Sequence, residues 1–197
     1  MLYHGNAGSA CYRSLYAELF AEAGYGTIVV KYSGYGGDPL LPRHERVKHD
    51  VANIVAFLES RSQQAAVVVG ESIGSGPAAL HATSHSAERP ALLLLSPFTS
   101  INDLARARFW FYPTSFLVEN AYDNRAVLSG YPGPALIVHG ENDRVVPTTM
   151  GRTLYEGFSG PADILIVPGA GHNDPFSTPT THTAIVNFLK NLQTSAP

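Results

Sequence analysis

The sequence predicts an α/β fold of three layers (α/β/α), in which helices cover both faces of a mostly parallel sheet of about six strands. Short apolar segments alternate with segments of helical periodicity from one end of the chain to the other, and one apolar segment ends in a Gly-x-Ser-x-Gly turn. Apolar strands separated by helices are typical of a parallel sheet that is buried on both faces. The 197 residues contain no internal repeat, so we expect a single domain over residues 1–197.

The strand-like segments are short and rich in β-branched and other apolar residues. They are expected at residues 2–4, 26–32, 67–69, 91–95, 135–139 and 164–167. Between them, apolar residues recur at helical spacing, as Val47, Val51 and Leu58 do. The helices are expected at residues 9–23 and 43–60, directly after residue 74, at 147–158, opened by a proline, and at 175–193.

Composition and charge exclude several classes of protein. The formal net charge of −3 argues against nucleic-acid or anionic-membrane binding as a main activity. No apolar run approaches the ~20 residues of a membrane span, and the N-terminus has no signal-peptide pattern, so we expect a cytoplasmic protein without a transmembrane segment. The single cysteine, Cys11, excludes an internal disulfide. Without zinc-spaced ligands or a phosphate loop, no metal or organic cofactor is expected.

The apolar segment 67–69 runs into Gly70-Glu71-Ser72-Ile73-Gly74 and then into small helix-forming residues. This context is typical of a nucleophile elbow, in which a sharp strand-to-helix turn raises the serine hydroxyl above the carboxyl end of the sheet. Glycine suits positions 70 and 74, because a Cβ there would crowd the turn. The helix N-terminus would point N–H groups at an oxyanion formed beside Ser72. An ordinary glycine-rich turn is the alternative interpretation, and Glu71 is expected to modulate the site at most.

A serine, an acid and a histidine follow three of the predicted strands, in the order Ser72, Asp143, His172. The carboxyl ends of parallel strands meet at one edge of a sheet, which is where such sheets bind ligands. A serine hydroxyl is a weak nucleophile until a base takes its proton. Histidine can be that base at neutral pH, and an aspartate can hold its tautomer.

Other residues compete for these roles. Asp123 has the pattern of a helix N-cap, Asp163 begins a strand, and Asp174 is very close to His172 in the chain. His4 and His139 also end strands, and we expect them to make supporting hydrogen bonds.

Taken together, these motifs resemble those of small serine hydrolases of the α/β-hydrolase superfamily, in the abhydrolase-domain branch with a His-Gly-Asn-Ala-Gly motif. The matching pieces are residues 4–8, 32–36, 70–74, 96–100, 139–147 and 171–174. The resemblance implies that Ser72 is the nucleophile, His172 the base and Asp143 the acid. It also implies an oxyanion hole made by the backbone N–H groups of Asn6 and Ile73, with Ala7 as the neighbour that could replace Asn6.

The implied activity is that of a serine carboxylic-ester hydrolase, which acts through an acyl-enzyme on small-to-medium acyl esters. A thioesterase or a peptidase of the same fold is the alternative, and a catalytically impaired binding protein is the second. The expected partner is therefore a small acyl ester or thioester.

Residues 99–133 are expected to form a small helical, lid-like insertion, because this fold often carries a lid there. Its aromatic residues would either line an acyl pocket or pack onto the core, with even weight on both. The pocket residues predicted on this basis are Phe98, Phe109, Trp110, Phe111, Phe116 and Val145.

The family usually carries two more strands before the strand that ends in His-Gly. The resemblance therefore implies an α/β-hydrolase fold lacking the first two strands, with residues 27–30 at a sheet edge. Exposed apolar edges invite pairing with another chain, so a homodimer is one expectation. Shielding of the edge by tyrosine and arginine side chains, or reduced stability, are the alternatives.

Overall fold

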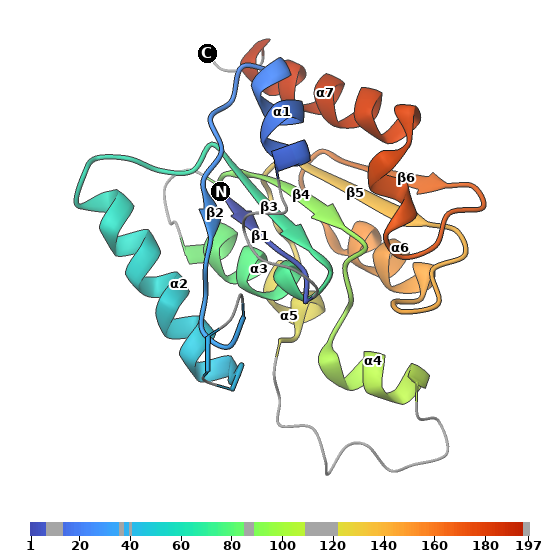
Figure 1. Cartoon of the computed structure of the whole chain (residues 1–197), viewed down its shortest axis with the longest axis horizontal. Coiled ribbons are helices and arrows are strands. Elements are labelled where there is room, and N and C mark those ends of the chain that lie inside the picture. Colours follow the sequence, from blue (N-terminus) through green and yellow to red (C-terminus); the bar gives the residue numbers. More distant parts are fainter. Residues whose placement is uncertain (7–13, 36–37, 40, 85–88, 109–121, 195–197) are drawn as a thin grey trace.

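The computed structural model describes residues 1–6, 14–35, 38–39, 41–84, 89–108 and 122–194 (Figure 1). In these ranges a six-stranded sheet has the order β2-β1-β3-β4-β5-β6. Every neighbouring pair of its strands is parallel. The predicted α/β class with a parallel sheet of about six strands is therefore confirmed.

The strands lie close to the predicted positions. They are β1 (Leu2–Tyr3), β2 (Val29–Val30), β3 (Val67–Glu71), β4 (Ala91–Leu95), β5 (Ala135–Gly140) and β6 (Ala162–Val167). The prediction of a strand over residues 26–32 was too long. β2 pairs only with β1, through Leu2 with Val29 and Tyr3 with Val30, so the ladder cannot extend beyond its two-residue partner.

The helices are α1 (Ser14–Glu22), α2 (His44–Glu59), α3 (Ser75–Ser84), α4 (Ile101–Arg108), α5 (Asn124–Leu128), α6 (Thr148–Gly157) and α7 (Pro179–Thr194). The predicted first residues of two helices, α6 and α7, are wrong. Pro147 is the N-cap of α6 rather than its first residue. The last helix begins at Pro179, after a 3-10 turn η4 (Asp174–Ser177). Thr178 is extended because a residue that precedes proline is disfavoured in the α region.

Two buried apolar clusters, one on each face, hold the sheet between its helices. In β4, Leu92 and Leu94 belong to one cluster while Leu93 and Leu95 belong to the other, because successive side chains of a strand point to opposite faces. Figure 1 shows α1 and α7 together on one side of the sheet, with α2 and α3 on the other. All five residues of β4 are buried, as a central parallel strand requires.

The region of the expected lid is described only in part, because residues 109–121 lie outside the described ranges. At its start α4 follows Ser100, which forms an isolated antiparallel bridge with Asp123. Asp123 then caps α5 by accepting the Ala126 N–H, as its N-cap pattern predicts. The lid itself stays a prediction.

β2 is the outer strand of the described sheet on its side, and Ile28 beside it is 57% exposed. The expected edge is therefore present, whereas the expected homodimer stays a prediction. No helix in the described ranges combines the length and the apolar character that crossing a membrane requires.

The turn after β3 packs directly against the end of β1, and this contact yields a stability prediction. A Cβ on Gly74 would lie 2.2 Å from the Tyr3 carbonyl oxygen, which is backbone and cannot rotate away. We expect Gly74→Ala to lower the free energy of unfolding by about 1 to 3 kcal/mol, measured by urea denaturation.

The matched control is Gly157→Ala, because a Cβ on Gly157 has no atom within 4 Å. This control should change the free energy of unfolding by less than about 0.5 kcal/mol. Equal stability of the two variants would contradict the close packing.

Candidate active site

Ser72 lies at the sharp turn between β3 and α3, in the 3-10 turn η2 (Ser72–Gly74). Its φ is +51°, a conformation that costs a non-glycine residue energy and that clusters at functional sites. The turn is narrow, since a Cβ on Gly70 would lie 2.7 Å from the Ala78 Cβ. The expected elbow geometry is therefore present.

Hydrogen bonds from the helix side support this strained turn. The Ser75 hydroxyl donates to the Ser72 carbonyl at 2.7 Å. The Asn124 side-chain amide donates both to the Ser75 hydroxyl at 3.1 Å and to the Phe98 carbonyl at 3.0 Å. Asn124, which sequence reasoning did not single out, thus ties the elbow to α5.

His172 reaches the elbow from the loop after β6. Its Nε2 lies 3.0 Å from the Ser72 Oγ, although the two residues are 100 positions apart in the chain. The Ser96 hydroxyl donates to the His172 carbonyl at 3.2 Å and so holds the loop to the end of β4. The His172 side chain is 14% exposed, so the site is partly open to solvent.

Asp143 lies in the loop after β5 and accepts hydrogen bonds at both carboxylate oxygens. Oδ2 lies 2.7 Å from the His172 Nδ1, and Oδ1 accepts the Val145 and Val146 N–H groups at 2.8 Å each. Since a carboxylate accepts, the His172 Nδ1 donates. The neutral ring therefore has a lone pair on Nε2, facing the Ser72 hydroxyl, which is the tautomer that a general base needs.

A second histidine, His139, lies against the same carboxylate. Its Nε2 donates to the Val146 carbonyl at 2.9 Å and is 3.3 Å from the Asp143 Oδ2. Both side chains in this contact are fully buried. The predicted supporting hydrogen bond of His139 is thus present, and its partners are the acid and its loop.

These contacts keep Asp143 ionised. Burial alone would raise the pKa of the Asp143 carboxyl. The hydrogen bonds from His139, His172 and the Val146 N–H outweigh that effect, so the pKa is held well below its usual range.

The competing acids lie elsewhere. Asp123 caps α5, Asp163 is exposed in β6, and Asp174 accepts the Gly171 N–H at 2.8 Å. Among the described residues, the hydrogen bond of the His172 ring to a carboxylate goes to Asp143. The same ranges contain no group of three or more His, Cys, Asp or Glu side chains placed to hold a metal ion.

Asn6 and Ile73 follow the ends of two neighbouring parallel strands. β1 pairs with β3 so that Tyr3 is opposite Gly70. Asn6 comes three residues after Tyr3, and Ile73 comes three residues after Gly70. The Glu71 carboxylate accepts the Gly5 N–H at 3.2 Å, which joins the two exits. An oxyanion hole between them stays a proposal.

The predicted pocket residues are placed only in part. Phe98 is 1% exposed and packs edge-on to Tyr122, with ring centroids 6.5 Å apart. Val145 is 43% exposed, next to Asp143 in the chain. The remaining four, Phe109, Trp110, Phe111 and Phe116, lie outside the described residues.

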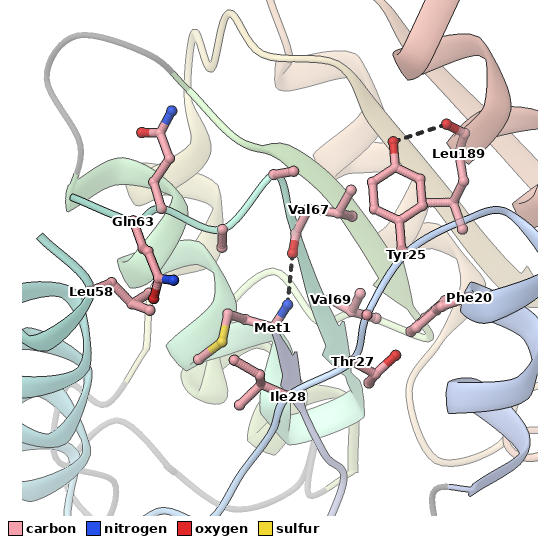
Figure 2. A pocket seen from close by; sticks show the side chains of 14 residues that line it. Met1, Phe20, Tyr25, Thr27, Ile28, Leu58, Gln63, Val67, Val69 and Leu189 are labelled. Atoms are coloured by element: carbon pink, nitrogen blue, oxygen red, sulfur yellow. Dashed lines mark hydrogen bonds between the residues drawn. The ribbon is translucent and has the colours of Figure 1, made fainter. Parts of the chain in front are cut away.

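A separate apolar cavity of about 320 Å³ lies at the amino ends of the strands (Figure 2). Met1, Tyr25, Ile28, Val67 and Leu189 are among its lining residues. In Figure 2 the Met1 amino group donates to the Val67 carbonyl and the Tyr25 hydroxyl donates to the Leu189 carbonyl. None of its lining residues belongs to the site around Ser72.

Comparison with known proteins identifies the family of the chain. The sequence model of the alpha/beta hydrolase family matches residues 2–129, and a model described as TAP-like protein matches residues 110–197. The chain belongs to the alpha/beta hydrolase family.

Two curated relatives match most of this chain. It is 29% identical over 177 residues to the uncharacterized protein Rv2307c of Mycobacterium tuberculosis, covering 87% of this chain and 62% of that protein. It is 30% identical over 175 residues to human alpha/beta hydrolase domain-containing protein 17B, covering 87% of this chain and 59% of that protein. The chain therefore spans about 60% of the length of these relatives.

Solved structures share the fold of this alpha/beta hydrolase. A monoacylglycerol lipase of Paleococcus ferrophilus superposes with a TM-score of 0.72 at 19% identity, covering 97% of this chain and 93% of that one. A bromoperoxidase of Bacillus anthracis superposes with a TM-score of 0.72 at 18% identity, covering 96% of this chain and 90% of that one. At these identities the likeness concerns the fold alone.

The lowered pKa of Asp143 predicts how stability depends on pH. An aspartate titrates at about 3.9 in an unfolded chain, so the unfolded state binds the proton first as the pH falls. Stability from ionised Asp143 is therefore complete above about pH 5, and is lost as the pH falls from about 4 toward the folded pKa. We expect the difference in free energy of unfolding between wild type and Asp143→Asn to shrink as the pH falls below about 4, measured by urea denaturation.

Asp163→Asn is the control, because Asp163 is exposed. It should differ little from wild type at each of these pH values. A wild-type advantage over Asp143→Asn that stays equal down to about pH 3.5 would argue against the assigned shift.

Proposed function

We propose that this hydrolase is a serine carboxylic-ester hydrolase that works through an acyl-enzyme. The observation that carries the proposal is the continuous hydrogen-bonded relay from the Ser72 Oγ through His172 to Asp143, with distances of 3.0 and 2.7 Å. A serine, a base within hydrogen-bond reach and a third group that orients the base are what activate a serine nucleophile.

In the first half-reaction the Ser72 Oγ attacks the ester carbonyl carbon while its proton passes to the His172 Nε2. The tetrahedral intermediate collapses, its bond to the alcohol oxygen breaks, and His172 gives the proton to that oxygen. The alcohol leaves and the acyl group stays as an ester on Ser72.

In the second half-reaction water attacks the acyl carbon and gives a proton to the same nitrogen of His172. Collapse of this intermediate breaks the bond to the Ser72 Oγ, which recovers its proton, and the carboxylic acid leaves. Asp143 stays ionised throughout and stabilises the imidazolium in both halves. The low pKa of Asp143 supports this role, since the carboxylate keeps its charge when His172 gains one.

The oxyanion of each intermediate would accept hydrogen bonds from the backbone N–H groups of Asn6 and Ile73. Ile73 is the residue after the nucleophile, and Asn6 follows the strand beside it. Each such donor contributes about 3 kcal/mol to transition-state stabilisation in other serine hydrolases.

The first test compares wild type with Ser72→Ala on p-nitrophenyl esters from acetate to palmitate, with a monoacylglycerol and an acyl thioester beside them. We expect ester hydrolysis in the wild type and a loss of kcat of about 10⁴-fold or more in Ser72→Ala, because the nucleophile is gone. The most active chain length measures the acyl pocket.

Ser60→Ala is the control, since Ser60 is exposed and its hydroxyl donates only to the nearby Phe57 carbonyl. Hydrolysis that survives in Ser72→Ala would overturn the assignment of the nucleophile. Faster turnover of the thioester than of every ester would replace the proposal by a thioesterase. A wild type without hydrolysis would leave a binding protein as the better reading.

A second prediction separates Asp143 from the nearby acid Asp174. Asp143→Asn should lower kcat by about 10³- to 10⁴-fold with little change in KM, because the amide no longer enforces the tautomer of His172. Steady-state kinetics on the best p-nitrophenyl ester measure both constants. Asp174→Asn should have a far smaller effect, and Asp163→Asn should equal the wild type. A larger loss in Asp174→Asn than in Asp143→Asn would reassign the acid.

A further inference from the structure

Two buried side chains form hydrogen bonds with Gly5, the residue that precedes the proposed oxyanion donor Asn6. On one side the Glu71 carboxylate accepts the Gly5 N–H at 3.2 Å. On the other side the His4 Nδ1 lies 2.8 Å from the Gly5 carbonyl oxygen. A carbonyl oxygen only accepts, so the His4 Nδ1 donates. Both peptide groups that flank the Gly5 α-carbon are therefore hydrogen-bonded to a side chain.

The second of these bonds sets the direction of the Asn6 N–H. The Gly5 carbonyl and the Asn6 N–H belong to one planar peptide group. The described chain contains no cis peptide bond, so these two groups point in opposite directions. The bond from His4 to the Gly5 oxygen on one side therefore aims the Asn6 N–H to the other side, and rotation of this peptide would break that bond.

The side chains of His4 and Glu71 are themselves buried and packed. His4 is 1% exposed and Glu71 is 8% exposed. The Tyr32 hydroxyl donates to the His4 carbonyl, and the Tyr32 ring lies 5.0 Å from the His4 ring. Tyr35 packs edge-on to the same imidazole, with centroids 6.3 Å apart.

The fit around Gly5 is close. A Cβ on Gly5 would lie 3.3 Å from the Glu71 Cδ, so the carboxyl group is packed against the glycine. Glu71 is also the residue directly before Ser72, so its hydrogen bond to Gly5 is made next to the proposed nucleophile. Residues 4–6, which follow β1, are thus held beside the turn that carries Ser72.

The geometry points to His4 and Glu71 as positioning residues for the oxyanion hole, with His4 aiming the Asn6 N–H and Glu71 holding the loop beside Ser72. This inference rests on the proposed function, because an oxyanion hole has meaning only if Ser72 attacks an acyl group. Preorganised donors stabilise a transition state because they need no reorientation as charge develops. Loss of either hydrogen bond should therefore affect the transition state more than the binding of substrate.

The test replaces each side chain by one that removes the hydrogen bond and by one that keeps it. His4→Leu removes the donor, whereas His4→Asn keeps an amide N–H near the position of Nδ1. Glu71→Ala removes the acceptor, whereas Glu71→Gln keeps an acceptor oxygen without the charge. We expect His4→Leu and Glu71→Ala to lower kcat about 10- to 100-fold with nearly unchanged KM, and the conservative variants to recover most of the loss.

The second measurement is inhibition by a trifluoromethyl ketone, which adds to the serine and forms a tetrahedral oxyanion. Its Ki should rise across the variants in proportion to the fall in kcat/KM, because both report stabilisation of the same charge. A merely structural role would lower stability or active fraction without this proportionality. Thermal melting and active-site titration of each variant separate those effects.

His49→Leu and Glu156→Ala are the controls, because both positions are exposed and lie on the outer helices α2 and α6. They should match the wild type. If His4→Leu does not fold, His4→Asn against His4→Gln decides, since glutamine places its amide beyond the Nδ1 position. Equal kinetics of those two, or wild-type kcat and Ki in Glu71→Ala, would overturn the positioning roles.

The same experiments distinguish failure of the positioning inference from failure of the proposed function. If wild type hydrolyses esters, Ser72→Ala does not, and the His4 and Glu71 variants keep full kcat, only the positioning inference fails. If wild type neither hydrolyses an ester nor forms an adduct with the ketone at Ser72, the proposed function fails, and the inference fails with it.

Discussion

The contact between the turn after β3 and the end of β1 is the constraint on which the site depends. A Cβ on Gly74 would meet the Tyr3 carbonyl oxygen at 2.2 Å, so only glycine lets the two backbones approach this closely. The approach brings the exit of β1 beside Ser72, and the pairing of Tyr3 with Gly70 sets its register. The strained φ of Ser72 persists because Ser75 and Asn124 hold the other side of the turn.

The second constraint is electrostatic and centres on a buried carboxylate. Burying a charge is costly unless it is paired and hydrogen-bonded, and Asp143 meets this condition with two backbone N–H groups and two histidines. The same contacts fix the orientation of the carboxylate, because Oδ1 accepts the two backbone N–H groups while Oδ2 faces both histidines. Stability of the loop and orientation of the base therefore come from the same hydrogen bonds.

The proposed active site and the apolar cavity of Figure 2 lie at different places in the sheet. Ser72, Asp143 and His172 follow the carboxyl ends of their strands, whereas the cavity is lined by the starts of β1 and β3 with Tyr25 and Leu189. Fold neighbours with TM-scores of 0.72 share this sheet at 18–19% identity, so the sheet accounts for the common shape and the loops for the individual chemistry.

The sequence by itself determined the α/β class, the positions of the strands, and the order of serine, acid and histidine, because apolar periodicity and glycine turns are local patterns. It also placed the elbow, since that motif depends on neighbouring residues. Only the tertiary structure decided which of four aspartates meets His172, because that contact joins residues 29 positions apart across the ends of β5 and β6. The same holds for the two-residue length of β2, which its partner strand limits, and for the hydrogen bond from the Gly5 N–H to Glu71, which joins residues 66 positions apart. Such contacts depend on strand order and register, and these follow from packing of the whole sheet.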